Sequence, residues 1–197
     1  ALTIAADISD TEQAKSSVEQ TVSVFGRLDV VVNNAGVMLL GPALEAPLEE
    51  WDRMIGINAT ALVHVTHAAL PHLVDAAQTS PRGVSDLVNI SSVAGRVARN
   101  GSNVYNLTKF GVGAFSESLR QELSPSHVRV SVIEPGAVDT ELVDHVREGY
   151  RATVRQRLAE IERLQAADIA DAIHYVVSRP RHVAINELLI RPTEQSS

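Results

Sequence analysis

Cysteine is absent from the 197 residues of this chain, and long apolar runs are absent as well. Without cysteine the protein can form no disulfide, and it can use neither a thiolate nucleophile nor a cysteine-ligated metal. The longest apolar runs, such as 28–32 and 59–65, are far shorter than the roughly 20 residues that a membrane-spanning helix needs. No basic segment followed by an apolar stretch opens the chain. We therefore expect a soluble, cytoplasmic protein with no membrane partner.

Positive charge is also scarce in this sequence. The chain has 17 Lys and Arg residues against 24 Asp and Glu residues, which gives a net charge of −7. The basic residues between Arg147 and Arg163 alternate with glutamates, so they form no continuous positive surface for a phosphodiester backbone. We expect no nucleic-acid partner. His64 and His67 share a helix face, but a third ligand at suitable spacing is missing, so we assign no metal.

The apolar content of 45% is enough for one core, and we expect a single domain over residues 1–197. Short β-branched runs alternate with longer stretches of helical period, which is typical of an α/β fold with a doubly wound parallel sheet. The predicted strands are Leu2–Ala6, Leu28–Asn33, Ser85–Ser91, Val128–Glu134 and Glu187–Ile190. The predicted helices are Asp10–Phe25, Leu48–Ala77, Ser102–Leu123, Leu142–Leu164 and Ala167–Val177.

Small or polar residues follow four of the predicted strands. In open α/β sheets, ligands bind beyond the carboxyl ends of the strands. Taken singly, each of these strand ends is more often an ordinary turn. Together, at one edge of a parallel sheet, they favour a binding edge. The residues are Asp7, the run Asn33-Asn34-Ala35-Gly36, the pair Ser91-Ser92 and the pair Pro135-Gly136.

Tyr105 and Lys109 lie one helical turn apart, so both project from the same helix face close to the Ser92 strand end. A phenol with a pKa of ~10 is a poor acid or base at neutral pH, but a cation ~5 Å away would favour the phenolate by ~3 kcal/mol. We therefore expect Lys109 to lower the pKa of Tyr105. A single Tyr-x-x-x-Lys spacing easily arises by chance, and its position after the Ser92 strand is what favours a site.

The combined motifs resemble the short-chain dehydrogenase/reductase family. They are the Asn33-Asn34-Ala35-Gly36 run, Ser92 thirteen residues before Tyr105, Lys109, Asn58, and Pro135-Gly136 followed by Thr140. The resemblance covers essentially the whole chain. It implies a Rossmann-like fold and an NAD(P)-dependent oxidoreductase that acts on a small alcohol or carbonyl compound.

The resemblance also implies roles for single residues. Tyr105 would exchange the proton, Ser92 would hydrogen-bond the substrate oxygen, Lys109 would hold the nicotinamide ribose, and Asn58 would anchor a water in a proton relay. The residues implied at the cofactor are Asp7, Asn34, Ala35, Gly36, Tyr105, Lys109, Pro135, Gly136 and Thr140.

A narrower likeness concerns four further runs, which are similar to the carbonyl reductase branch that includes clavulanic acid dehydrogenase. This likeness implies NADP(H) in preference to NAD(H). The runs are Val37–Pro42, Ala68–Leu73, Glu117–Glu122 and Leu188–Pro192.

The glycine-rich turn with which the family opens does not precede Ala1. We therefore expect an N-terminally incomplete domain that lacks its first two strands. In the strand order 3-2-1-4-5-6 these would lie between the Leu2–Ala6 and Leu28–Asn33 strands.

Three functions remain open: an active carbonyl reductase or alcohol dehydrogenase, a nucleotide-sensing scaffold, and an inactive fragment. The stretch from Asp144 to Leu164 could be a substrate lid or a solvated helix. The helices Leu48–Ala77 and Ser102–Leu123 have more apolar positions than one sheet face needs. Together with the resemblance, this surplus predicts a homo-oligomer, a tetramer or a dimer.

Overall fold

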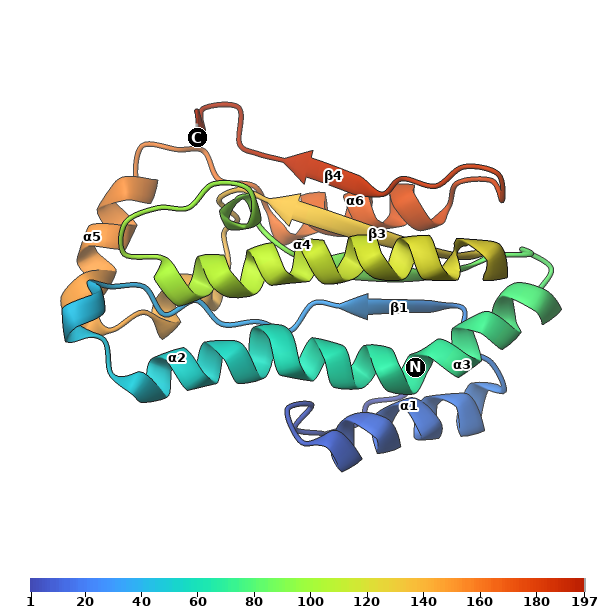
Figure 1. Cartoon of the computed structure of the whole chain (residues 1–197). Helices are drawn as coiled ribbons and strands as arrows, with labels where there is room; N and C mark the ends of the chain where they lie inside the picture. The colour runs from blue at the N-terminus through green and yellow to red at the C-terminus, as the bar shows by residue number, and fades with distance from the viewer. Residues whose placement is uncertain (197) are drawn as a thin grey trace.

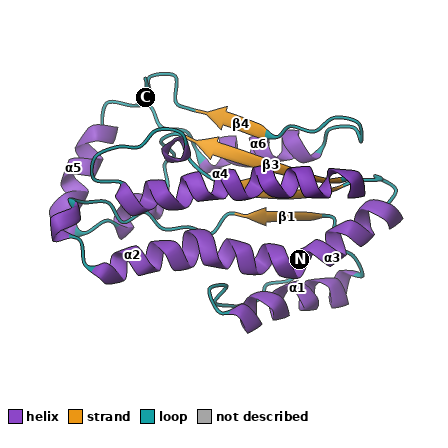
Figure 2. Cartoon of the chain, viewed as in Figure 1, coloured by secondary structure: helices purple, strands orange, loops and turns teal. Residues whose placement is uncertain are grey.

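The computed structural model describes residues 1–196, and its core is a parallel sheet of four strands in the order β1-β2-β3-β4 (Figures 1 and 2). The strands are β1 Val30–Asn33, β2 Ser85–Ile90, β3 Val128–Pro135 and β4 Glu187–Ile190. The helices are α1 Thr11–Phe25, α2 Leu48–Ile55, α3 Leu62–Thr79, α4 Asn103–Leu123, α5 Glu148–Leu158 and α6 Ala166–Val177. The α/β architecture expected from the sequence is confirmed.

The central strands β2 and β3 are buried almost along their full length, because helices cover both faces of the sheet. On one face, α3 and α4 pack on the sheet, with Leu73 of α3 against Leu87 of β2 and Val130 of β3. On the other face, Ile169 of α6 packs against Val88 and other core residues of β2 and β3. Figure 1 shows α3 and α4 in front of the sheet and α6 behind it. The sheet is therefore doubly wound.

The prediction of a strand over Leu2–Ala6 is wrong. This segment has no regular secondary structure, and β1 is an edge strand of the sheet in the part of the chain that the structure describes. A β-strand needs a neighbour for its backbone hydrogen bonds, and none of the described strands pairs with this segment. The other four predicted strands are confirmed, with ends that differ by at most two residues.

The predicted helix Leu48–Ala77 exists, but it is not a uniform α-helix. A π-helical stretch, Gly56–Ala61, separates α2 from α3. This stretch contains Asn58, whose side chain is 2% exposed. Single π-helical turns are frequent at functional sites because they redirect one side chain without ending the helix.

The predicted helix Leu142–Leu164 is wrong, since the segment is divided. A 3₁₀ turn, Glu141–His145, is followed by extended backbone at Val146 and then by α5. Val143, Val146 and Val154 form a small core of their own with Met38 and Leu40 of the loop after β1. Packing against this loop therefore overrides a continuous helix.

Both ends of this divided segment are joined by hydrogen bonds. Leu164 N–H donates to the Ala137 carbonyl (3.0 Å), and Asp139 N–H donates to the Leu164 carbonyl (2.7 Å). An ion pair between Arg163 and Asp139 (2.8 Å) lies beside them. We call this arrangement the clasp, and the segment from Thr140 to Arg163 the lid segment.

Across residues 1–196, no helix combines the length and the apolar composition that crossing a bilayer requires.

Candidate active site

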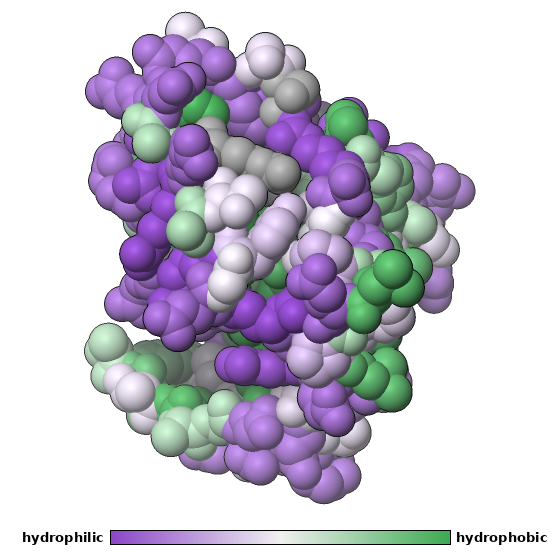
Figure 3. Space-filling model, turned by 90° about the vertical axis from the view of Figure 1, so that its left-hand side faces the viewer, coloured by the Kyte–Doolittle hydropathy of each residue, from purple (hydrophilic) through white to green (hydrophobic). Residues whose placement is uncertain are grey.

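The carboxyl ends of the four strands lie at one edge of the sheet, on the left in Figure 1. The run beginning at Asn33, the pair Ser91-Ser92 and the pair Pro135-Gly136 all fall at this rim, as the sequence predicts. Figure 3 views the molecule from this end and shows a mainly hydrophilic surface with a hollow above its lowest part. The rim is therefore accessible and polar.

Tyr105, Ser92 and Lys109 come together at this rim. Tyr105 lies in the first turn of α4, and Lys109 follows one turn later. The three side chains belong to residues that are 7%, 9% and 6% exposed, respectively. Ser92 and Tyr105 share a side-chain hydrogen bond. The Lys109 ammonium lies 5.8 Å from the centroid of the Tyr105 ring.

The pKa of Tyr105 differs from the expectation. Burial raises the pKa of the phenol, and the hydrogen bond with Ser92 opposes this effect only in part. Lys109 is itself affected, because burial lowers the pKa of its ammonium to about 8. The prediction that the pKa of Tyr105 lies below its ordinary value is therefore wrong for this structure. The cost of removing the phenolate from water exceeds the attraction of the cation.

Asn58 is held in place by both backbone groups of Val37. Its Oδ1 accepts from Val37 N–H (2.8 Å), and its Nδ2 donates to the Val37 carbonyl (2.9 Å). Gly36 lies beside it, because a Cβ at Gly36 would stand 3.3 Å from Asn58 Oδ1 and 3.9 Å from Lys109 Nζ. The structure thus brings Asn58, Gly36 and Lys109 together, whereas Asn34 and Ala35 are exposed in the same loop.

Pro135 and Gly136 end β3 at the rim, and the C-terminal residues reach this point. Gln195 Oε1 accepts from Ala137 N–H (2.8 Å), and a Cβ at Gly136 would collide with the Gln195 carboxamide. Thr140 is exposed and caps the 3₁₀ turn that opens the lid segment.

Asp7 is not brought to this cluster by any hydrogen bond or ion pair of the described residues. Its carboxylate accepts from Ser9 N–H (3.0 Å) and from Ser9 Oγ (2.6 Å), so it closes an exposed turn before α1. These hydrogen bonds lower the pKa of Asp7. The expectation that Asp7 follows a strand is wrong, because the preceding strand is not formed.

A buried polar network beneath the rim was not predicted. Asn33 Nδ2 donates to Asn89 Oδ1 (2.8 Å) and to Thr66 Oγ1 (2.9 Å), and Asn89 Nδ2 donates to Ser116 Oγ (2.9 Å). The network joins β1, α3, β2 and α4, so it fixes the position of the helix that bears Tyr105. Apolar periodicity could not predict this network, because it identifies only apolar residues as buried.

Asn106 is a second residue that the sequence analysis missed. Its Nδ2 donates to the carbonyls of Ala94 (2.6 Å) and Val97 (3.1 Å), and its Oδ1 accepts from Arg99 N–H (3.2 Å). It thereby fixes the loop that follows Ser92. The available signal was an asparagine, a weak helix former, inside a helix and directly after Tyr105.

Gly95 allows this loop to lie against α4. A Cβ at Gly95 would stand 2.7 Å from Ser91 Oγ and 2.8 Å from the Lys109 carbonyl oxygen. Arg96 then holds the loop over the sheet, because its Nε donates to Glu134 at the end of β3 (2.6 Å). The side chains of this cluster are therefore supported from three strands.

Comparison with known proteins gives consistent matches. The sequence profile of the family described as short chain dehydrogenase matches residues 1–151. Serine 3-dehydrogenase of Rhizobium radiobacter is 38% identical over 195 residues, which cover 98% of this chain and 75% of that protein. The closed form of a serine dehydrogenase complexed with NADP+ superposes with a TM-score of 0.87 at 34% identity, covering 98% of this chain and 76% of the other. A 3-ketoacyl-(acyl-carrier-protein) reductase from Brucella melitensis complexed with NADH has a TM-score of 0.82 at 27% identity, with 96% and 76% covered.

Proposed function

The chain belongs to the short chain dehydrogenases, and from this premise we propose that it transfers a hydride between a nicotinamide cofactor and a small alcohol or carbonyl compound. The observation that supports this proposal is the buried cluster of the Tyr105 phenol, the Ser92 hydroxyl and the Lys109 ammonium at the sheet rim. The proposed tetrad is completed by Asn58.

A nicotinamide dinucleotide fits the residues at this rim. Gly36 lets the backbone lie close to Asn58, because a Cβ there would stand only 3.3 Å from Asn58 Oδ1. The Lys109 ammonium has three donor hydrogens, and the Ile90 carbonyl takes one of them (2.9 Å), so ribose hydroxyls suit the others. When bound, the cofactor supplies or accepts the hydride. We propose that Asn34, Ala35, Gly36, Pro135, Gly136 and Thr140 contact it, while Asp7 stays a prediction for its adenine end.

Tyr105 is the proposed proton donor for carbonyl reduction. Because burial raises the pKa of its phenol, Tyr105 is protonated at neutral pH, which is the state that reduction requires. Ser92 hydrogen-bonds Tyr105 and would likewise bind the substrate oxygen. Once the proton has moved, the Lys109 ammonium stabilises the phenolate, since a neighbouring cation favours the charged form.

For the cofactor we propose NADP(H) in preference to NAD(H), supported by the likeness to a serine dehydrogenase complexed with NADP+. For the substrate we propose a small 3-hydroxy acid such as serine, supported by the 38% identity to a serine 3-dehydrogenase. Reduction of simple aldehydes and ketones is the second candidate. The clavulanic acid dehydrogenase branch and a cytoplasmic location stay predictions.

A direct assay tests this function. The protein is incubated with NADP+ or NAD+ and serine or 3-hydroxybutyrate, and the absorbance of the reduced cofactor is followed; in the reverse direction, NADPH or NADH is offered with small aldehydes and ketones. We expect turnover in at least one direction and a higher kcat/KM with the NADP couple. Tight cofactor binding without turnover on any substrate would instead favour a nucleotide-sensing scaffold.

We also propose that the chain forms a homo-oligomer through α3 and α4. Leu107 and Phe110 of α4 are 63% and 43% exposed, and Val63 of α3 is 41% exposed. Apolar side chains gathered on neighbouring helices favour an interface. Light scattering of the wild type and of Phe110→Asp tests this. We expect a mass above one chain that falls in the variant, and an active wild-type monomer would contradict the proposal.

A further inference from the structure

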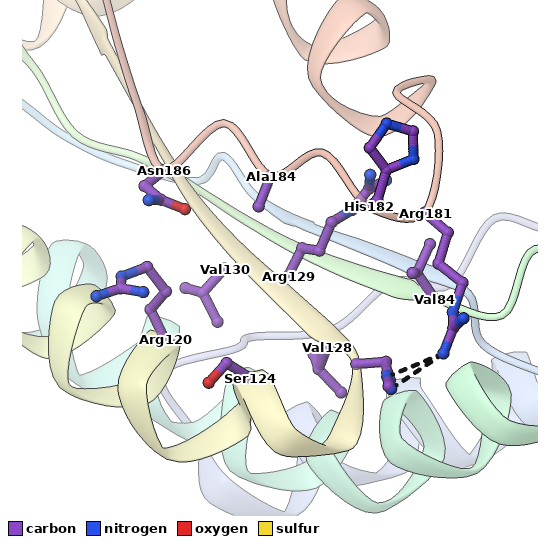
Figure 4. Close-up of a pocket in the computed structure, with 11 residues that line it drawn as sticks. Val84, Arg120, Ser124, Val128, Arg129, Val130, Arg181, His182, Ala184 and Asn186 are labelled. Atoms are coloured by element: carbon purple, nitrogen blue, oxygen red, sulfur yellow. Dashed lines mark hydrogen bonds between the residues drawn. The ribbon is translucent and has the colours of Figure 1, made fainter.

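A second cavity lies at the opposite end of the sheet from Tyr105. It has a volume of about 430 Å³ and is formed by the C-terminal end of α4, the start of β3 and the loop before β4 (Figure 4). The eight residues of β3 separate it from Pro135 by about 23 Å at 3.3 Å per residue. Its lining residues are Val84, Arg120, Ser124, His127, Val128, Arg129, Val130, Arg181, His182, Ala184 and Asn186.

This cavity is lined by three arginines and two histidines and by no carboxylate, in a chain whose net charge is −7. Arg120 is paired with Glu117 (2.6 Å), so its charge is offset. Asp86, in contrast, faces two guanidinium groups, those of Arg82 (2.6 Å) and Arg129 (2.7 Å). This group of two arginines and one aspartate therefore has a net charge of one positive unit beside the cavity.

Arg181 adds a second uncompensated charge. Within residues 1–196 it forms no ion pair with a carboxylate; it donates to the Gly83 carbonyl (3.1 Å) and contacts His127 Nε2 (3.1 Å). Its stem lies against Gly83, where a Cβ would stand 3.0 Å from Arg181 Cδ. Gly83 also has a φ of +63°, which favours glycine there. The local backbone is thus shaped to hold this arginine at the cavity.

His127 lies at the same place and has a left-handed backbone conformation. Its φ of +59° is the single positive value among the non-glycine residues that the structure describes. Histidine is among the residues that adopt this left-handed conformation most readily, and here it ends the 3₁₀ turn Ser124–Ser126. Because the Arg181 guanidinium can only donate, the facing ring nitrogen accepts, and the ring proton is on the other nitrogen. His127 therefore holds the Arg181 guanidinium from the side of the 3₁₀ turn.

We propose that this cavity binds a small phosphate monoester, independently of the nicotinamide site. The Nε of Arg181 and one Nη2 hydrogen are already used, so the donors left for the oxygens of a phosphate group are those of Nη1 and the second Nη2 hydrogen. The valines at 84, 128 and 130 and Ala184 offer an apolar floor for the group that bears the phosphate. The volume lies within the range of small-molecule sites.

Phenyl phosphate is a suitable probe, and inorganic phosphate and phenol are tested separately as its two component groups. Binding to the full chain is followed through the ring NMR signals of His127 and His182. We expect phenyl phosphate to shift both signals at lower concentration than either component alone. We expect Arg181→Gln to weaken this binding about tenfold, because it removes the unpaired charge and these donors.

Arg179→Gln is the matched control, because Arg179 stacks on Tyr175 (4.1 Å) and does not line the cavity. It should leave phenyl phosphate binding within twofold of wild type. Equal losses in both arginine variants would mean unspecific attraction and overturn the proposal. The proposal would also be overturned if phenol bound as tightly as phenyl phosphate. It would likewise be overturned if phenyl phosphate left the signals of His127 and His182 unchanged.

Discussion

A buried positive charge lies at each end of the sheet, and the two differ in the number of their hydrogen-bond partners. Arg129 lies near the start of β3, and Lys109 is a residue of α4 whose ammonium reaches the end of β2. These residues are 7% and 6% exposed. Arg129 forms two hydrogen bonds with Asp86 (2.7 and 3.1 Å) and donates to carbonyls at Val177, Arg179, Pro180 and Val183. Among the described residues, Lys109 has no carboxylate partner and donates to the Ile90 carbonyl (2.9 Å). The guanidinium of Arg129 therefore has protein partners for its donors, whereas the ammonium of Lys109 keeps donors that a ligand can use.

The strongest test of the rim is Tyr105→Phe. We expect kcat to fall by roughly 10² to 10⁴-fold with cofactor affinity nearly unchanged, because the ring remains and only the transferable proton is lost. Tyr175→Phe, at a side chain that is 49% exposed, should change neither value. More than a tenth of the wild-type kcat in Tyr105→Phe would remove Tyr105 from the role of acid.

At the architectural end, Arg129→Met should lower the free energy of unfolding by about 3 kcal/mol, because it takes away one partner of a buried ion pair. Urea unfolding measures this loss. Lys15→Met, which removes an exposed ion pair with Glu19, should cost less than about 0.5 kcal/mol. Similar effects of the two substitutions would show that the ion pair of Arg129 contributes no more than a surface pair.

Lys109→Met should behave in the opposite way, with higher stability and lost activity. Burial lowers the Lys109 pKa to about 8 from its ordinary 10.5, so between these values the unfolded chain binds more protons than the native protein. Stability of the wild type therefore rises with pH across this window. The difference between the pKa values corresponds to about 3 kcal/mol, so the variant should exceed the wild type most at pH 7.

Urea unfolding of both proteins at pH 7 and pH 9.5 measures this difference. The stability gap between Lys109→Met and wild type should narrow at the higher pH. A gap that does not depend on pH would mean that the ammonium is as well accommodated at the rim as the guanidinium of Arg129.

The smallest effect is expected for Asn106→Ala. It removes the three hydrogen bonds that hold the loop after Ser92, at a cost of about 1 to 2 kcal/mol in unfolding. Because Ser92 would then be less well placed, kcat should fall while KM for the cofactor stays. Asn103→Ala is the control on the same helix, since among residues 1–196 the only hydrogen bond of the Asn103 side chain is the one its Oδ1 accepts from Val104 N–H (2.7 Å). Equal kcat values for the two variants would make Asn106 merely structural.

The parts of the structure that depend on local spacing were predictable from the sequence. The apolar runs of β2 and β3 indicated covered strands, and the spacing of four positions from Tyr105 to Lys109 placed both on one helix face. The predicted start of the first helix at Asp10 was also close to the observed one, because Asp10 Oδ1 accepts from Gln13 N–H (2.9 Å) and so caps α1.

What failed depended on neighbours that a sequence pattern does not specify. Leu2–Ala6 has suitable composition for a strand but no partner. The expected pKa of Tyr105 took account of one neighbouring cation, Lys109. The direction of the pKa shift is instead set by burial among residues that are far apart in the chain. The lid segment divides because its valines pack on the loop after β1.

The clasp beneath the lid segment has an evolutionary consequence. Because its two ends are joined by backbone hydrogen bonds at Ala137, Asp139 and Leu164, the intervening stretch is a loop on a closed stem. The entropy of closing a loop grows only slowly with its length, and here the stem already fixes both ends. Insertions, deletions or whole replacements between 140 and 163 can therefore accumulate without moving the sheet. Under the proposed function, this replaceable loop is where substrate preference can diverge, while the buried cluster of Tyr105, Ser92 and Lys109 stays in place.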